Sequence, residues 1–334
     1  MRFTFKDFLA LEVSPALGCT EPVAVALAAS AAAGLLPSRS LEHIRITVDG
    51  NVFKNGLAVM IPGTGGKRGL DLASALGAVA GDPSRFMQVL DGIGRPQVDQ
   101  AAEMIDSGRV EVDLDPAQQG LFIQAEVNAG ADTARAVIQG AHDSIISLTL
   151  NGRGISDSPL LAQPQDTGST SAHHDVRHLE AWLREQSLSS LLKLLDQVDD
   201  DDLATLRLGV DMNRKLAEYG LDHAPGLGVR HALSALAEDK LLAPDMLLAA
   251  KIQTAAAADA RMAGAGLPAM SSAGSGNNGL TAILPIWAAG KFMDCSENAL
   301  LRAIGLSHLI TAYIKTYTGR LSAVCSCSLA AGAG

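Results

Sequence analysis

The sequence predicts an α+β protein, with a small ferredoxin-like α/β domain inserted after an N-terminal helix and followed by an all-α helical domain. Alternating polar and apolar residues, the pattern of half-buried strands, are confined to the first half of the chain. Helical periodicity runs through the second half without a convincing strand. The composition is 48% hydrophobic but only 4% aromatic, which suits closely packed helices with cores of small aliphatic residues. The predicted boundaries are a helical segment at 1–37, the α/β domain at 38–152, a linker at 153–175 and the helical domain at 176–334.

The first segment combines a short helix with a cysteine at the start of a second helix. Gly18-Cys19-Thr20-Glu21-Pro22 precedes an alanine-rich run, which predicts a helix over 22–35. Thr20 is a good N-cap and Pro22 fits the first turn. Cys19 would then lie at a helix N-terminus, where unpaired N–H groups favour a thiolate. A buried structural cysteine is the alternative.

The α/β domain follows from alternating strands, amphipathic helices and turn residues. Asn55-Gly56 is turn chemistry, and Pro62–Lys67 is a glycine-rich turn that could bind an anion or be an ordinary tight turn. Strands and helices in this order suggest a split β-α-β fold. The pattern predicts strands over 43–48, 110–114, 122–127 and 144–150, and helices over 70–80, 97–106 and 131–139.

The linker contains loop-forming residues, and the chain after it reads helical. His173-His174 with His178 could form a metal site, but no cysteine or carboxylate is spaced with them, so a polar helix start is favoured. The aspartate run 199–202 is expected to cap the next helix. The helices are expected within 179–195, 203–219, 229–237, 244–265, 281–292 and 296–314.

Charge and cysteine usage exclude several classes of protein. A net charge of −10 argues against nucleic acid and an anionic membrane surface as partners. Four cysteines, two of them in a Cys-x-Cys, do not form a disulfide framework and indicate a reducing compartment. Residues 1–6 lack the order of a signal peptide, and the apolar run 23–36 is shorter than the roughly 20 residues that span a membrane. We therefore expect a soluble cytoplasmic protein.

A polar, glycine-rich break interrupts the apolar helices at Gly274–Gly279. It matches G-x-G-x-x-G, but a helix precedes it, whereas the dinucleotide fingerprint follows a strand. Its glycines allow close approach of a ligand, and Ser275, Asn277 and Asn278 can hydrogen-bond a carboxylate or an ammonium group. An ordinary interhelical turn is the alternative.

The last stretch holds Cys325-Ser326-Cys327 at the start of a Gly/Ala run. Two such thiols suggest a metal or iron–sulfur ligand set that is only partly present, or else two buried structural cysteines. Lys315 and Arg320 lie just upstream and could pair with a substrate carboxylate, whereas His308 is expected to be a core or surface residue. Because the chain stops inside a small-residue run, we expect it to be cut in mid-domain.

Together these stretches resemble the superfamily of iron–sulfur-dependent L-serine dehydratases and L-cysteine desulfidases, most closely its single-chain cysteine desulfidase-like branch. The resemblance covers nearly the whole chain. The shared motifs occur in family order, at 12–22, at 54–56 with 61–65, at 274–279, and at 319–322 followed by Cys325-Ser326-Cys327.

The resemblance implies a β-eliminating lyase that converts L-cysteine and water to pyruvate, ammonia and sulfide. L-Serine dehydration by the same mechanism is the alternative, and a homodimer is implied. The family binds a [4Fe-4S] cluster through three cysteines, with one iron open to act as a Lewis acid. Cys327 is the favoured ligand and Cys325 the second choice, with the remaining ligands expected beyond residue 334. Cys295 lies outside the motifs and receives no role.

The resemblance also implies roles for the motif residues. Cys19 is the candidate base, and Glu21 of the same motif is the second catalytic candidate. The expected substrate-binding residues are Thr20, Lys54, Asn55, Thr64, Ser275, Asn277, Asn278, Lys315 and Arg320.

Two other functions remain open. The Ser272–Gly279 stretch is a little like the loops around pyridoxal phosphate, with Lys251 upstream, but that fold needs strands that this half does not show. Alternatively, the 40–152 unit could sense an amino acid beside an inactive helical half.

Overall fold

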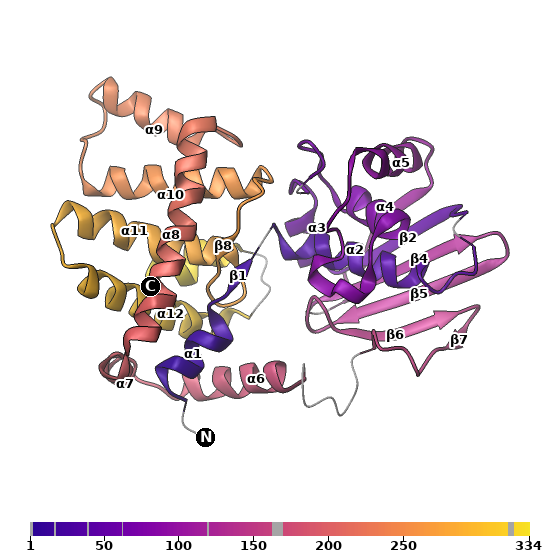
Figure 1. The fold of residues 1–334 in the computed structure, drawn as a ribbon, viewed down its shortest axis with the longest axis horizontal. Coiled ribbons are helices and arrows are strands. Elements are labelled where there is room, and N and C mark those ends of the chain that lie inside the picture. The colour runs from indigo at the N-terminus through magenta and orange to yellow at the C-terminus, as the bar shows by residue number, and fades with distance from the viewer. Residues whose placement is uncertain are drawn as a thin grey trace. The chain divides into compact units, whose positions relative to one another are not determined.

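The computed structural model describes residues 3–16, 18–38, 40–61, 63–118, 120–161, 170–319 and 324–334. The chain divides into two compact units. Residues 19–166 form the α/β unit, and residues 1–18 with 167–334 form the helical unit (Figure 1). The first 37 residues are therefore shared between the two. The fold class predicted from the sequence, an α/β domain followed by a helical C-terminal region, is confirmed, and the sheet of the α/β part is mixed.

The α/β unit contains a six-stranded sheet in the order β3-β2-β4-β5-β6-β7. Strands β2 and β3 are parallel and the other pairs are antiparallel. The strands are β2 (His43–Val48), β3 (Val110–Leu114), β4 (Phe122–Ala129), β5 (Asp132–Gln139), β6 (Ile145–Leu150) and β7 (Arg153–Gly154). The helices are α2 (Thr20–Ala33), α3 (Gly50–Gly56), α4 (Leu70–Ala80) and α5 (Arg95–Asp106), with a 3₁₀ segment at Pro83–Gln88.

Helices α2 and α4 cover one face of this sheet (Figure 1). Alternate residues of β2 and β4 are buried on that face, as the two-residue period of a strand requires. Every residue of α2 from Ala24 to Ala33 is buried. The two helices touch along their backbones, because a Cβ atom at Gly77 would lie 2.7 Å from the Cα atom of Ala26.

Three local predictions in this part of the chain were wrong. The segment 131–139 is not a helix but strand β5, in which Ala134, Ala136 and Ile138 are buried in alternation. The alanines suggested a helix, but the pairing with β4 and β6 decided the structure. The unit therefore has one parallel crossover, from β2 to β3, and not the two of a split β-α-β fold. Asn55-Gly56 ends helix α3 and is not a free turn, and the N-cap of α2 is Cys19, not Thr20.

The helical unit is built from helices around one short pair of strands. Helix α8 crosses α10, α11 and α12 (Figure 1). The helices are α1 (Phe5–Glu12), α6 (Thr170–Arg184), α7 (Leu188–Leu194), α8 (Asp200–His223), α9 (Val229–Glu238), α10 (Met246–Met262), α11 (Gly276–Phe292) and α12 (Glu297–Thr318). Leu195–Gln197 is a 3₁₀ turn, and Cys327–Ala331 forms a π-helical turn that packs on α11 and α12.

The expectation of an all-α domain is corrected by strands β1 (Pro15–Ala16) and β8 (Ala269–Met270), which pair antiparallel. Asn213 of α8 is fully buried and hydrogen-bonds both backbone polar groups of Met270 in β8. Its Oδ1 atom accepts from the Met270 N–H at 2.8 Å, and its Nδ2 atom donates to the Met270 carbonyl at 3.3 Å. At Gly279 of α11 a Cβ atom would lie 2.8 Å from the Met270 carbonyl carbon. Strand β8 is therefore fixed between α8 and α11.

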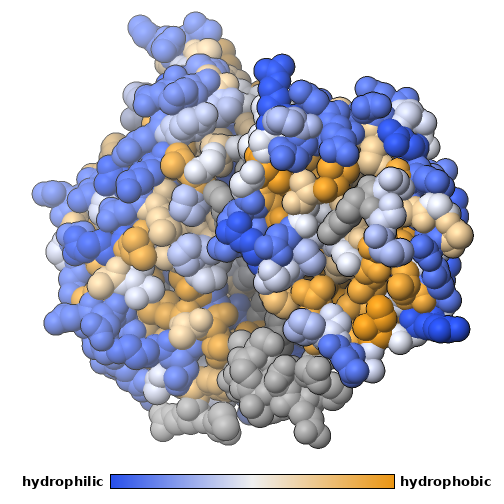
Figure 2. Space-filling view, turned by 45° about the vertical axis from the view of Figure 1, so that its right-hand side comes forward, coloured by the Kyte–Doolittle hydropathy of each residue, from blue (hydrophilic) through white to orange (hydrophobic). Residues whose placement is uncertain are grey.

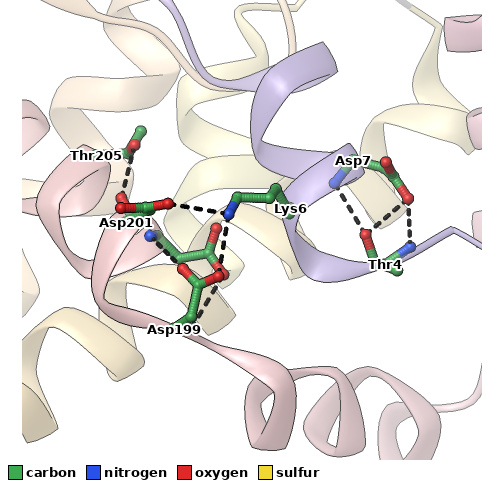
Figure 3. A network of polar contacts seen from close by, with 7 residues as sticks. Thr4, Lys6, Asp7, Asp199, Asp201 and Thr205 are labelled. Atoms are coloured by element: carbon green, nitrogen blue, oxygen red, sulfur yellow. Dashed lines mark hydrogen bonds and ion pairs between the residues drawn. The ribbon is translucent and has the colours of Figure 1, made fainter.

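The N-termini of α1 and α8 are capped by their own side chains. Thr4 and Asp7 form a capping box on α1, and Asp199 caps α8. Figure 3 shows Lys6 of α1 reaching Asp199 and Asp201, with N–O distances of 3.0 and 3.3 Å. The aspartate run is thus a helix cap, and its exposed ion pairs stabilise the fold little.

The helical unit exposes several large apolar side chains around α9. In that helix no residue is buried, and nearby Leu227, Leu241 and Leu247 are 91%, 70% and 60% exposed. On the face shown in Figure 2, hydrophilic residues cover most of the surface and hydrophobic residues gather in patches. Among the helices described, none is long and apolar enough to cross a membrane.

The backbone contact between α2 and α4 can be tested with a single methyl group. We expect Gly77→Ala to lower the free energy of unfolding by about 1–3 kcal/mol, because the added carbon overlaps the Ala26 backbone. Gly154→Ala is the matched control, since a Cβ atom there meets nothing within 4 Å. Urea unfolding measures both variants, and equal stabilities would contradict the close contact.

Candidate functional site

The first group of predicted site residues surrounds the start of α2 in the α/β unit. Cys19 is the N-cap of this helix and makes no capping hydrogen bond with its side chain. Its sulfur donates to Oε2 of Glu21 at 2.8 Å, and the Thr20 hydroxyl donates to the same oxygen at 3.2 Å. Asn55 Nδ2 donates to Oε1 of Glu21 at 3.0 Å. Three of the predicted residues therefore hydrogen-bond one buried carboxylate.

The environment keeps the Glu21 carboxylate charged. Burial raises its pKa, but the charge of His142 and the hydrogen bonds from Cys19 and Asn55 outweigh that effect, so the pKa lies below its usual value. An ionised carboxylate accepts the Cys19 proton in a hydrogen bond and orients the sulfur. In the structure Cys19 is therefore a hydrogen-bond donor to a carboxylate, whereas its place at a helix N-terminus favours a thiolate. His142 lies in the β5–β6 turn, and no motif pointed to it.

The other two predicted residues of the α/β unit are placed differently. Lys54 lies in the last turn of α3 and is exposed. The buried hydroxyl of Thr64 donates to the carbonyls of Ile61 and Lys67 at 2.6 and 3.1 Å. Thr64 therefore closes its own glycine-rich loop.

The second group lies in the helical unit at the start of α11. Ala273 and Gly274 turn the chain with φ of 48° and 75°, and Ser275 is the N-cap without a side-chain hydrogen bond. The interhelical break predicted over Gly274–Gly279 is therefore shorter, because helix α11 already begins after Ser275. Asn277 and Asn278 belong to the first helical turn, where N–H groups lack helical partners.

Arg261, in the last turn of α10, lies against the start of α11. No sequence motif pointed to it. Its side chain is 6% exposed. Its Nη1 atom donates to Oδ1 of Asn277 at 3.0 Å, and its Nη2 atom donates to the Gly18 carbonyl. A Cβ atom at Gly276 would lie 2.7 Å from the guanidinium carbon. The available signal was a basic residue in the last turn of an alanine-rich helix, close before the glycine-rich motif.

The Cys-x-Cys segment contacts the same helix start. Ser326 donates to Oδ1 of Asn278 at 2.9 Å and accepts from Lys315 Nζ at 3.4 Å. Asn278 is fully buried and Lys315 is 5% exposed. The structure thus brings together Lys315, Asn278 and the residue between the two cysteines. Arg320 lies outside the described residues, as do the side chains of His173 and His174.

Cys325 and Cys327 lie with their sulfurs 2.9 Å apart. Cys325 is exposed and Cys327 is partly buried. The hydrogen bond with Cys325, together with burial, raises the pKa of Cys327. The Cys327 sulfur is therefore a thiol unless a metal displaces its proton.

These thiols fit an iron–sulfur cluster in kind but not in number. Such clusters are held by cysteine thiolates, usually four. Within the described part of the chain, no group of three or more His, Cys, Asp or Glu residues is placed to hold a metal ion. Cys325 and Cys327 supply two thiols, and Cys295 packs against the hydrophobic core instead.

A buried histidine supports the turn before α11. His308 of α12 is fully buried, and its Nδ1 atom lies 2.8 Å from the Ser272 hydroxyl. Burial lowers the pKa of His308 to about 4, so the ring is neutral at physiological pH. It is a core residue, as expected, and it links α12 to the turn.

Comparisons with known proteins point to one family. Residues 122–334 match the family model described as serine dehydratase alpha chain. The chain is 52% identical, over its whole length and 75% of the relative, to the UPF0597 protein of Desulfatibacillum aliphaticivorans. It is 50% identical to that of Desulfotalea psychrophila, covering 100% of this chain and 76% of the relative, and 42% identical to that of Geobacter sulfurreducens, covering 99% and 74%. No solved structure matches.

The buried ring of His308 should make stability depend on pH. Because its folded pKa of about 4 is below the unfolded value near 6.5, the folded state binds fewer protons in that window. Stability is therefore complete above about pH 6.5 and falls by about 3 kcal/mol toward pH 4. We expect His308→Asn, which keeps a polar atom near Ser272, to lose this dependence of the free energy of unfolding on pH, as measured by urea unfolding. His223→Asn, at an exposed histidine, is the control and should keep it.

Proposed function

Because the chain belongs to the serine dehydratase alpha-chain family, we propose that it is a β-eliminating lyase that converts L-cysteine and water to pyruvate, ammonia and sulfide. The family match and the relatives confirm the superfamily predicted from the motifs, which consists of dehydratase-type lyases. The observation that best supports a cluster-dependent lyase is the Cys-x-Cys segment, held by Ser326 against Asn278 and Lys315 at the start of α11. L-Serine is the second candidate substrate, favoured by the family's own description.

In this proposal Cys19 removes the α-proton of the substrate. Its sulfur must first lose the proton that it shares with Glu21. Glu21, with its lowered pKa, does not keep that proton, which passes to solvent, and the carboxylate orients the sulfur. The resulting carbanion expels the β-substituent with its bonding electron pair. The aminoacrylate becomes the imine, which water hydrolyses to pyruvate and ammonia.

The remaining predicted residues are proposed to bind the amino-acid substrate. In the helical unit these are Ser275, Asn277, Asn278 and Lys315, which lie at or next to the start of α11. In the α/β unit they are Thr20 and Asn55, which hydrogen-bond Glu21, and Lys54. For Thr64 and Arg320 the same role stays a proposal from the motifs alone.

Cys327, with Cys325 second, is proposed as a thiolate ligand of a [4Fe-4S] cluster. When bound, such a cluster with an open iron supplies a Lewis acid for the leaving group. The other ligands would come from outside the described residues. The relatives are longer than this chain, which covers 74–76% of the three named above.

We also propose a cytoplasmic homodimer. The exposed leucines around α9 are the apolar surface of the helical unit that a second copy would cover.

The lyase proposal is tested by measuring pyruvate from L-cysteine and from L-serine, with full-length protein reconstituted anaerobically with iron and sulfide. We expect iron-dependent pyruvate that is lost in Cys327→Ala together with the visible absorbance of the cluster. Cys325→Ala should have a smaller effect, and Cys295→Ala is the control that should keep both. Amino-acid binding without pyruvate from either substrate, with the absorbance intact, would overturn the lyase and favour a sensing role.

The proposed base can be separated from the cluster. We expect Cys19→Ser to lower kcat by about 10²–10⁴-fold, because a hydroxyl is a far weaker base at neutral pH. The absorbance of the cluster and the binding of substrate should change little. Cys295→Ser is the matched control. Unchanged turnover in Cys19→Ser would exclude this sulfur as the base.

A further inference from the structure

The start of α11 gathers buried hydrogen-bond donors that have no acceptor. Nε of Arg261 and Nδ2 of Asn278 are buried, and neither has a hydrogen-bond partner among the described residues. The Ser275 side chain does not cap the helix, so the N–H groups of the first turn add further donors. Buried donors are normally paired, and each one left unpaired destabilises the fold.

The positive charge of Arg261 at the start of α11 is also uncompensated among the described residues. Arg261 is more than nine-tenths buried, and within the described residues it donates only to an amide oxygen, a backbone carbonyl and a thioether sulfur. It forms no ion pair there with a carboxylate. The N-terminus of α11 adds a partial positive charge of its own. A buried cation beside a helix N-terminus is stable when an anion binds both.

The guanidinium is aimed at the helix start and does not merely lie near it. Gly276 is the first residue of α11, and a Cβ atom there would overlap the guanidinium group, with the central carbon 2.7 Å away. The absence of a side chain at Gly276 therefore lets Arg261 lie directly against the first turn. The unpaired Nε–H group of Arg261 and the N–H groups of the first turn can then donate hydrogen bonds to the same ligand.

We propose that Arg261 is a specificity-determining residue that binds the carboxylate of the substrate, together with the Asn278 amide and the first turn of α11. Every unpaired group named here is a donor, which suits a carboxylate and excludes the substrate's ammonium group from this subsite. The identity of the ligand as an amino acid rests on the proposed function. A substrate whose carboxylate is replaced by a neutral amide should lose this interaction.

Arg261 also has a second contact that the test must allow for. Its Nη2 atom donates to the carbonyl of Gly18, the residue that precedes Cys19 in the chain. A substitution could therefore weaken the fold as well as the binding of a carboxylate. The ratio of two affinities measured on the same sample avoids this difficulty, because both ligands meet the same folded molecules.

The experiment compares L-alanine with L-alaninamide by calorimetric titration of the full-length protein. L-Alanine lacks a leaving group, so it reports binding without turnover. We expect the wild type to bind L-alanine at least about 30-fold more tightly than the amide, since loss of a buried charged partner has an effect of this order. Arg261→Gln should bring the ratio near one, and Arg261→Lys should give an intermediate value. Gly276→Ala should also lower the ratio, because it displaces the guanidinium.

Arg302→Gln is the matched control. Arg302 is also an arginine of the helical unit, but it donates to Asn298 and to the carbonyl of Leu195. It should keep the wild-type ratio. A ratio that stays above 30-fold in Arg261→Gln, or a wild type that does not distinguish the acid from the amide, would overturn the proposal.

The outcome separates this inference from the lyase proposal. Arg261-dependent discrimination without pyruvate formation would leave the carboxylate subsite standing and remove the lyase. Normal pyruvate formation, with an acid-to-amide affinity ratio that is unchanged in Arg261→Gln, would leave the lyase standing and remove the carboxylate subsite.

Discussion

The helical unit depends on the contact between the Met270 backbone and α11. The helix carries no side chain at Gly279, so its first turns lie directly on strand β8, which Asn213 holds from the opposite helix. This contact fixes where α11 begins. Arg261, Asn277 and Asn278 then converge on a helix start whose position is set by backbone atoms, which deform less than side chains.

A different principle organises the start of α2. There one buried carboxylate, Glu21, gathers a thiol, a hydroxyl and an amide from two helices. The charge of His142, with the hydrogen bonds from Cys19 and Asn55, outweighs the cost of burial and keeps the carboxylate ionised. The two groups of residues are thus opposite in chemistry. One is an anion surrounded by donors, and the other is a cation and a helix N-terminus without an anion.

The sequence predicted elements well where one period dominates. Strand β2 and helix α4 have the predicted bounds, because alternation or amphipathicity is unbroken in them. Prediction failed at Asp132–Gln139, where alanines fit either structure and only pairing with neighbouring strands decides. For the candidate site, the motifs pointed to Cys19, Glu21 and Asn278, whose roles are proposals. Arg261 and His142 were missed, because their importance comes from neighbours distant in the sequence and not from any local pattern.

The alanine-built helix α2 has a thermodynamic consequence for the α/β unit. Most of its buried side chains from Ala24 to Ala33 are methyl groups, which have no rotamers to lose when the chain folds. Each contributes little apolar area, so α2 gains less from the hydrophobic effect than a leucine-rich helix would. In this helix the side-chain entropy lost on folding and the apolar area gained are therefore both small. Its share of the heat-capacity change on unfolding is correspondingly low, so the stability it contributes varies little with temperature.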